Sequence, residues 1–114
     1  MTTMTDKLER QFHERLLDIY KLLAGQYGYH ATRFIQMLNQ QGAVETVTAL
    51  IHSTEPSEGY TKLWELRRLD LSVEALSLRA EWQELFTDED REAATARLNS
   101  YEFNFSQLTD PERG

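Results

Sequence analysis

The chain has no cysteine. Disulfide bonds, zinc–thiolate sites and cysteine nucleophiles are therefore excluded. A chain without cysteine also fits a reducing compartment. Proline and glycine are scarce as well, with two prolines and five glycines in 114 residues. This content argues against a disordered or fibrous polymer and favours a folded globular domain.

Long hydrophobic runs are also missing. The longest uninterrupted apolar runs have two or three residues, whereas a membrane-spanning helix needs about 20. The N-terminal stretch MTTMTDKLERQF is polar and has no apolar run of the kind found in secretory signals. We therefore predict a cytoplasmic protein with no membrane association.

The chain also has few positive charges. It contains 12 Lys and Arg against 19 Asp and Glu, which gives a net charge of −7. Residues 1–59 carry five basic and seven acidic side chains, residues 60–69 three and one, and residues 70–114 four and eleven. An acidic protein repels nucleic acid unless a local basic patch dominates. Nucleic-acid binding is disfavoured, and the segment at 60–69 is the one place that supports it.

Helical periodicity dominates what is present. In residues 5–24 the apolar side chains Leu8, Phe12, Leu16, Ile19 and Leu23 fall three or four positions apart, which draws one stripe on a helix. Thr5 is the predicted N-cap and Gly25 the predicted end. Further helices are predicted at about 30–41, 43–52 and 60–68, after Ser72, and at 80–86 and 87–101, with Thr87 and Asp90 as a capping box.

No β-branched alternation bounded by turn residues competes with this pattern. The predicted fold is all-α, a compact bundle of five to seven mostly short helices in which the first is the longest. The length of the chain, 114 residues, favours a single domain over residues 1–114. Within it we predict a three-helix half at 5–53, a second half at 60–103 and a fraying tail at 106–114. The loop at 53–59 separates the two halves.

Three histidines are candidate metal ligands or bases. His13 lies one helical turn after Glu9, His52 precedes Glu55 in a loop, and His30 lies in a turn before a helix. Two side chains do not close a metal site, and no HExxH motif is present. We interpret these residues as surface and turn residues and predict no metal and no cofactor.

A catalytic interpretation would need Asp70 and Glu74, which lie four positions apart, together with His30 or His52 and Arg67. Asp70 reads more simply as a polar acceptor between two helices. There is no glycine-rich phosphate loop and no nucleophile elbow. The sequence therefore predicts a protein that is not an enzyme and names no catalytic residue.

The densest segment is GYTKLWELRRLDLSVEALSL, residues 59–78. Tyr60, Leu63 and Trp64 fall at helical spacing and are predicted core residues, with large apolar area to bury. Arg67 and Arg68 are consecutive, so on a helix they point in directions about 100° apart and one of them faces solvent. Arginine beside aromatic residues is also typical of interface hot spots. The candidate partner-binding residues are Lys62, Arg67, Arg68 and Arg79.

Two stretches carry a resemblance: YGYHATRFIQMLNQQGAVET, and GYTKLWELRRLDLSVEALSL followed by EWQELFTDEDREAATARL. Together they resemble a small helical module of uncharacterised bacterial proteins. That module occurs alone or C-terminal to larger chains, some of them with nuclease or DNA-defence parts. The resemblance covers about residues 10–103. It implies an accessory or adaptor role and supplies no active-site residues.

The leading functional hypothesis is a non-enzymatic protein-interaction or adaptor module from bacteria or phage. One alternative is a nucleic-acid-binding accessory domain that uses the basic segment 62–68. Another is an acidic inhibitor that mimics nucleic acid. The amphipathic first helix, with Leu17 and Tyr20 beside its stripe, also leaves a homodimer open.

Overall fold

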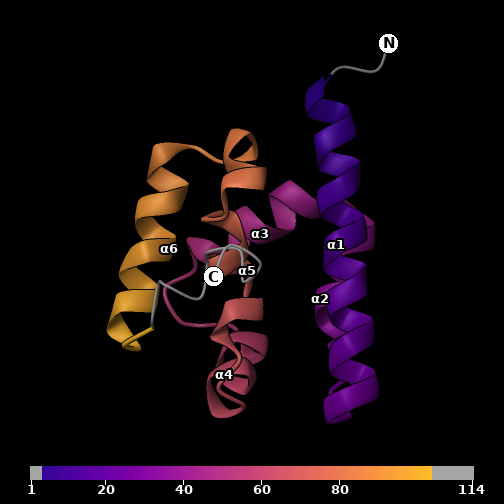
Figure 1. Cartoon of the computed structure of the whole chain (residues 1–114), viewed down its shortest axis with the longest axis vertical. Coiled ribbons are helices and arrows are strands. Elements are labelled where there is room, and N and C mark those ends of the chain that lie inside the picture. The colour runs from indigo at the N-terminus through magenta and orange to yellow at the C-terminus, as the bar shows by residue number, and fades with distance from the viewer. Residues whose placement is uncertain (1–3, 104–114) are drawn as a thin grey trace, which may run out of the picture. The chain divides into compact units, whose positions relative to one another are not determined.

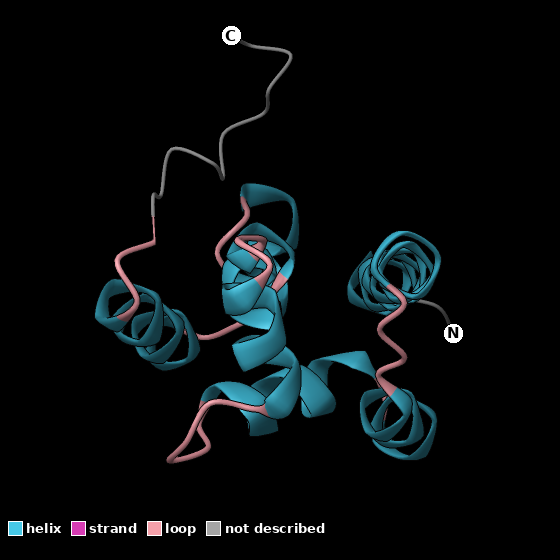
Figure 2. Ribbon diagram, turned by 90° about the horizontal axis from the view of Figure 1, so that it is seen from below, coloured by secondary structure: helices cyan, strands magenta, loops and turns pink. Residues whose placement is uncertain are grey.

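The regular secondary structure in the described part of the chain is all helical. The computed structural model describes residues 4–103, and these include six α-helices, two 3₁₀ helices and no strand (Figures 1 and 2). This confirms the predicted all-α fold and the first helix as the longest. In order the elements are α1 (Met4–Tyr27), α2 (Thr32–Gln41), α3 (Ala43–Ile51), α4 (Glu58–Glu65), η1 (Leu69–Leu71), α5 (Val73–Ser77), η2 (Ala80–Leu85) and α6 (Asp88–Ser100).

Helix α1 is longer at both ends than its sequence signals indicate. It begins at Met4, so Thr5 lies inside the helix and is not its N-cap. It also runs through Gly25, the predicted end, to Tyr27. A single glycine costs a helix about 1 kcal/mol and does not have to end it. The turn comes at Gly28, whose φ of 65° lies in the left-handed region, and the Tyr29 amide donates to the Leu23 carbonyl at 3.1 Å.

Helices α2 and α3 follow the predicted ranges closely. They meet at Gly42, which has a φ of 88° and whose amide donates to the Leu38 carbonyl at 3.0 Å. A positive φ without steric cost is what glycine supplies at such a helix end. Leu38 is buried, whereas Phe34 and Ile35 are half-buried.

The chain divides into two compact units, residues 1–46 and residues 47–114. The division falls inside α3, and each unit is described by itself. In the first unit the stripe of α1 is buried at Phe12, Leu16, Ile19 and Leu23, each at most 6% exposed. Figure 2 looks along α1 and α2 and shows the loop that connects them. The single-domain organisation and the tail at 106–114 stay predictions, and the tail lies outside the described residues.

In the second unit each α-helix starts at a side-chain cap. Ser57 accepts from the Tyr60 amide at the start of α4, and Ser72 accepts from the Ala75 amide at the start of α5. Thr87 begins α6 with the predicted capping box. Helix α4 starts two residues earlier and ends three residues earlier than predicted, because the Ser57 cap places Gly59 inside the helix and Arg67 turns the chain out of it.

The core of the second unit is built from short elements, with α6 alongside α5 (Figure 1). Two of its aromatic residues, Tyr60 and Trp82, are 2% and 8% exposed, and this confirms the predicted place of Tyr60 in the core. Its other buried apolar residues are Val47, Ile51, Leu63, Leu69, Leu71, Ala75, Leu76, Phe86, Ala94 and Leu98. None of the helices in the described residues has the length and apolar character needed to cross a membrane.

The start of α6 is tied to the end of α3. The Asp90 carboxylate accepts from the Thr87 amide at 3.0 Å, and its Oδ1 lies 2.7 Å from Nε2 of His52. Burial alone would raise the pKa of Asp90, but the hydrogen bonds from His52 and Thr87 outweigh burial and hold this pKa below its ordinary value. His52 therefore binds Asp90 across 38 positions of sequence, and the predicted neighbour Glu55 is not its partner.

The depressed pKa of Asp90 predicts a pH-dependent contribution to folding. A carboxyl group whose pKa is lower in the folded state stabilises that state above its unfolded pKa of about 3.9, and the contribution is lost as the pH falls through the folded value. We expect Asp90→Asn to lower the free energy of unfolding by about 1 kcal/mol near pH 7, the usual size of a capping interaction. Urea unfolding near pH 3 should show a smaller difference. An equal loss at both values would contradict a role for the charge.

Candidate functional site

Trp64 is the large hydrophobic side chain that the described residues leave exposed, at 48%. Its predicted place in the core is wrong, although Tyr60 and Leu63 from the same segment are buried. The reason is geometric, because Tyr60 and Leu63 define the inward direction of α4 and Trp64 projects from the side of that face. With only eight residues, α4 ends one position after Trp64 and offers the indole no further turn to pack on.

Trp64 is held in place by an aromatic neighbour, Tyr101, which directly follows α6. The rings of Trp64 and Tyr101 meet edge to face with centroids 5.7 Å apart, and Tyr101 meets Tyr60 in the same way at 5.0 Å. Such pairs stabilise by about 0.5–1.5 kcal/mol beyond the area they bury. Tyr101 therefore links an exposed ring to a buried one, and the indole is positioned without being covered.

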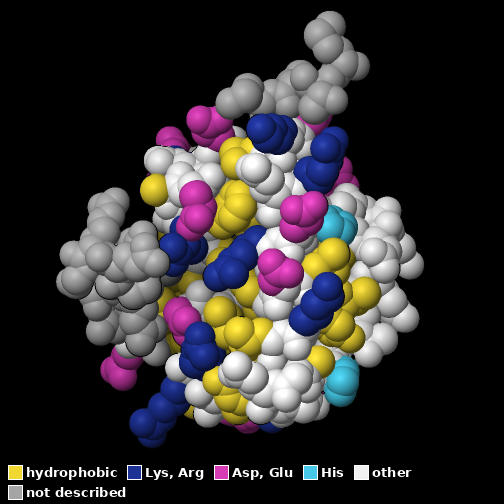
Figure 3. Space-filling model, turned by 45° about the vertical axis from the view of Figure 1, so that its right-hand side comes forward, with side chains coloured by type: hydrophobic (Ala, Val, Ile, Leu, Met, Phe, Trp, Pro, Cys, Tyr) yellow, Lys and Arg dark blue, Asp and Glu magenta, His cyan; other side chains and the backbone are white. Residues whose placement is uncertain are grey.

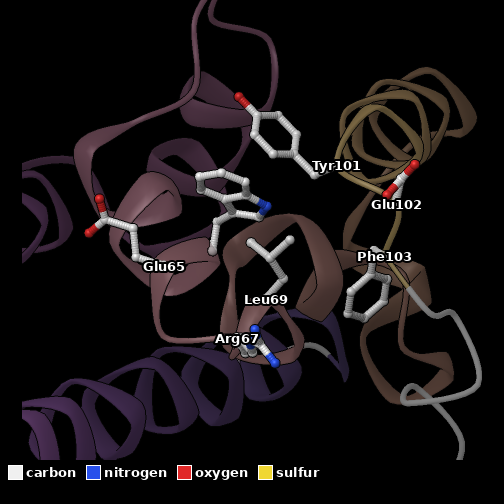
Figure 4. Close-up of a pocket in the computed structure, with 7 residues that line it drawn as sticks. Glu65, Arg67, Leu69, Tyr101, Glu102 and Phe103 are labelled. Atoms are coloured by element: carbon white, nitrogen blue, oxygen red, sulfur yellow. The ribbon is translucent and has the colours of Figure 1, made fainter.

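An open cleft of about 460 Å³ surrounds this indole (Figure 4). We call it the Trp64 cleft, and its lining is Trp64, Glu65, Arg67, Leu69, Tyr101, Glu102 and Phe103. Figure 4 shows the Glu65 and Glu102 carboxylates pointing outward on opposite sides, with Tyr101, Leu69 and Phe103 between them. An apolar centre inside a charged rim is the composition of a binding hot spot.

The walls of the cleft are two helix C-termini of the same construction. At the end of α4 the Arg68 amide donates to the Leu63 carbonyl and the Arg67 amide to the Trp64 carbonyl. At the end of α6 the Phe103 amide donates to Leu98 and the Glu102 amide to Asn99. Each pair of bonds is a complete Schellman motif, whose left-handed residue is usually glycine.

Here the left-handed positions hold Arg67, with a φ of 60°, and Glu102, with a φ of 55°. They are the two non-glycine residues with positive φ in the described part of the chain, and both line the Trp64 cleft. A left-handed backbone costs a residue with a Cβ about 1–2 kcal/mol. Strained backbone of this kind clusters at binding and catalytic sites, so the two side chains are candidates for a role in ligand binding.

We expect glycine at either position to stabilise the fold. Arg67→Gly and Glu102→Gly should each raise the free energy of unfolding by about 0.5–1 kcal/mol, because glycine adopts positive φ without the steric penalty. Urea unfolding of the two variants measures this, with Ser100→Gly, inside α6, as the control that should destabilise. Destabilisation by both cleft substitutions would show that these side chains support the fold.

The electrostatics of the cleft are unfavourable as they stand. The C-terminus of a helix carries the negative end of its dipole, which favours cations and disfavours anions. Glu65 ends α4 and Glu102 follows α6, so both carboxylates stand where a negative charge is destabilising. Among the described residues neither of them makes an ion pair, and Arg67 is the one lining residue with positive charge.

The four predicted partner-binding residues have different surroundings. Arg67 is exposed and lines the Trp64 cleft, and Lys62 is half-buried in the last turn of α4. Arg68 binds Asp70 through two hydrogen bonds of 3.0 and 3.1 Å, and Arg79 binds Glu81. Arg68 is therefore the arginine that pairs with a carboxylate, and Arg67 is the one that faces solvent.

Local pairing of opposite charges has a consequence for the surface. Two of the four predicted cations are neutralised by carboxylates two positions away. In Figure 3, Lys and Arg side chains lie interspersed with Asp and Glu and with apolar side chains. Of the four predicted residues, Arg67 is the one that lines the Trp64 cleft.

A buried ion pair lies in the second unit, and the sequence did not indicate it. Glu74 is fully buried, and its Oε2 accepts from Nη1 of Arg97 at 3.0 Å. The same nitrogen donates to the Leu50 carbonyl at 3.0 Å, and Nη2 donates to the Ser53 carbonyl. The guanidinium therefore fastens the end of α3 and its following loop to α5 and α6.

Burial raises the pKa of Glu74, although its own backbone amide and the Arg97 guanidinium pull the pKa down. Burial and the Glu74 charge also raise the pKa of the Tyr60 hydroxyl, which donates to the Arg97 carbonyl at 3.3 Å. Glu74 and Arg97 are absent from the lining of the Trp64 cleft. Their geometry is that of a structural clamp inside the second unit.

The residues that a catalytic interpretation requires do not converge. Asp70 is half-buried inside η1 and binds Arg68, so it is an ion-pair partner and not the predicted acceptor between helices. Glu74 binds Arg97, His52 binds Asp90, and His30 is exposed in the turn before α2. Within residues 6–103, no three His, Asp or Glu side chains come close enough to hold a metal ion.

Comparison of this chain with models of protein families, with curated proteins and with solved structures finds no match.

Proposed function

We propose that this chain is a non-enzymatic protein-interaction module that binds its partner at the Trp64 cleft. The half-exposed indole is the observation that supports this most directly. Each Å² of apolar surface that is removed from water stabilises a protein by about 25 cal/mol. Trp82 contributes this free energy to folding because it is almost completely buried, whereas Trp64 leaves about half of its surface in water. A bound partner that covers Trp64 would recover this free energy.

Two further features support a partner at this place. Trp64 is held by Tyr101, so binding requires little ordering of the side chain, and rigid aromatic residues are typical anchors of interfaces. The strained residues Arg67 and Glu102 both line the same cleft. Strain that glycine would relieve is consistent with side chains retained for binding.

The charge distribution favours a protein partner over nucleic acid. Residues 47–114 carry seven basic and fourteen acidic side chains, a net charge of −7, so the unit that contains the segment 62–68 repels phosphates. An acidic inhibitor that mimics nucleic acid would use the same charge. It would not require an exposed tryptophan or two left-handed charged residues, so the interaction module accounts for more of the structure.

Selection of binding peptides from a random display library tests this function. We expect the selected peptides to bind the unsubstituted protein and to lose at least about tenfold in affinity for Trp64→Ser, the size of effect seen at hot-spot residues. His30→Ser is the control, because it replaces an exposed ring in the first unit. Peptides that bind both variants equally well would remove the Trp64 cleft from the proposed function.

A further inference from the structure

We infer that the Trp64 cleft takes arginine side chains from a basic segment of the partner protein. This inference rests on the proposed function and specifies the chemistry of the partner. The guanidinium would lie on the exposed Trp64 indole, and the negative charges of Glu65 and Glu102, on opposite sides of the cleft, would attract it. The segment's apolar residues would cover the rest of the exposed Trp64 side chain.

The aromatic lining is the first reason. Trp64, Tyr101 and Phe103 all contribute rings to one cleft, and the indole is 48% exposed. The face of an aromatic ring attracts cations, tryptophan most strongly, and arginine is the side chain most often found there. Arginine also stacks flat on a ring, because its guanidinium is planar and weakly hydrated compared with the ammonium group of lysine.

The second reason is the unbalanced negative charge of the walls. Glu65 and Glu102 each stand at the C-terminal end of a helix, where the dipole already disfavours an anion. Glu102 also occupies a left-handed position, so neither its charge nor its backbone is favoured locally. A cation bound between the two walls would relieve both repulsions, whereas an anion would add a third.

Charge complementarity on a larger scale points the same way. The unit that contains the cleft has a net charge of −7, while residues 1–46 carry five basic and five acidic side chains and are neutral. The field around the second unit therefore attracts a basic segment and speeds its approach. Arg67 opposes such a ligand, since it is the one cation in the lining, and this gives the inference a sharp test.

The test uses Trp82→Phe, in which Trp64 is the one remaining tryptophan and reports binding through its fluorescence. The probes are three short capped peptides in which Leu alternates with Arg, with Gln or with Glu. We expect the Arg peptide to bind at least about tenfold more tightly than the Gln peptide, and the Glu peptide to bind least. The affinity of the Arg peptide should fall as salt is added.

Two matched variants locate the charge effect. Asparagine tolerates the left-handed region, so Glu102→Asn and Arg67→Asn remove a charge and keep the backbone of each Schellman turn. We expect Glu102→Asn to weaken the Arg peptide about fivefold and Arg67→Asn to strengthen it about threefold, the range of single exposed charge pairs. Opposite signs for the two variants exclude a general effect on folding.

Several results would overturn the inference. These are equal affinity for the Arg and Gln peptides, the reverse effects of the two Asn variants, or no change in Trp64 fluorescence. Failure here is separable from failure of the proposed function. Display-selected peptides that depend on Trp64 but lack arginine would uphold the interaction module and reject its preference for a basic partner.

Discussion

Arg97→Met should destabilise the protein by about 3–5 kcal/mol, the range measured when one partner of a buried ion pair is removed. The variant loses the hydrogen bonds of the guanidinium to Glu74 and to the carbonyls of Leu50 and Ser53. It also leaves the fully buried Glu74 carboxylate without a counter-charge. Since the free energy of unfolding of a small domain is about 5–15 kcal/mol, this loss removes a large part of it. Urea unfolding near pH 7 measures it.

The control for this prediction is the removal of both charges. The single variant Glu74→Leu should lose less folding stability than Arg97→Met, because Arg97 keeps its hydrogen bonds to the carbonyls of Leu50 and Ser53. In the double variant Glu74→Leu/Arg97→Met the buried carboxylate is gone, so its stability should exceed that of Arg97→Met. Replacing a whole buried pair by apolar groups is often neutral. A double variant that is weaker than Arg97→Met would show that the guanidinium acts without Glu74.

The pH dependence of Arg97→Met follows from the same carboxylate. Burial already raises the pKa of Glu74 above its ordinary value of 4.5, and loss of Arg97 removes a group that lowers it. A carboxyl group with a raised pKa binds its proton more tightly when folded, so stability increases as the pH falls through the folded value toward 4.5. The deficit of Arg97→Met should therefore shrink at mildly acidic pH. This direction is opposite to that of the Asp90 carboxylate.

Trp64 and Trp82 should respond to substitution in opposite ways. Trp82→Ala removes a side chain that is 8% exposed and should cost about 3–5 kcal/mol of folding stability. Trp64→Ser removes a ring that is 48% exposed and pairs with Tyr101, so its folding cost should be about 1 kcal/mol. Its effect on partner binding should be larger, at least about tenfold in affinity, or about 1.4 kcal/mol.

Parallel measurements of unfolding and of binding to display-selected peptides separate these effects. A binding loss for Trp64→Ser without a comparable stability loss assigns the indole to recognition. If Trp64→Ser unfolds as readily as Trp82→Ala, then Trp64 is a core residue and the proposed function has lost its main support.

The sequence predicted the fold class and most helices because the determining signals are local. The stripe of Phe12, Leu16, Ile19 and Leu23 is one face of a helix, and the Thr87 and Asp90 capping box needs only three positions of separation. The predicted end of the first helix at Gly25 was wrong, because α1 continues through Gly25 and the chain adopts a positive φ only at Gly28.

The candidate site was predicted only in part. Arg67 was named, but Trp64 was placed in the core because helical spacing gives the direction of a side chain and not what lies opposite. Tyr101, Glu102 and Phe103 directly follow α6, more than 30 positions later in the chain, and their approach to α4 depends on tertiary packing. Two ion pairs were not predicted for the same reason. The partners are 23 positions apart in Glu74–Arg97 and 38 positions apart in His52–Asp90.

No local signal in the sequence marks the two strained positions. Arg79 also lies two residues beyond the end of a helix, α5, without a glycine nearby, and its φ is −72°. A charged residue at this place therefore does not predict a left-handed backbone. Only the structure shows that Arg67 and Glu102 have positive φ and line one cleft.

The openness of the cleft is tested most directly by acrylamide quenching of two variants, Trp82→Phe and Trp64→Phe, each with one tryptophan. Acrylamide is neutral, so the acidic rim of the cleft does not repel it. We expect acrylamide to quench Trp64 in the first variant strongly and Trp82 in the second only weakly, and the Leu–Arg peptide to protect Trp64 alone. Equal protection of both tryptophans from acrylamide in the absence of any ligand would contradict an open Trp64 cleft.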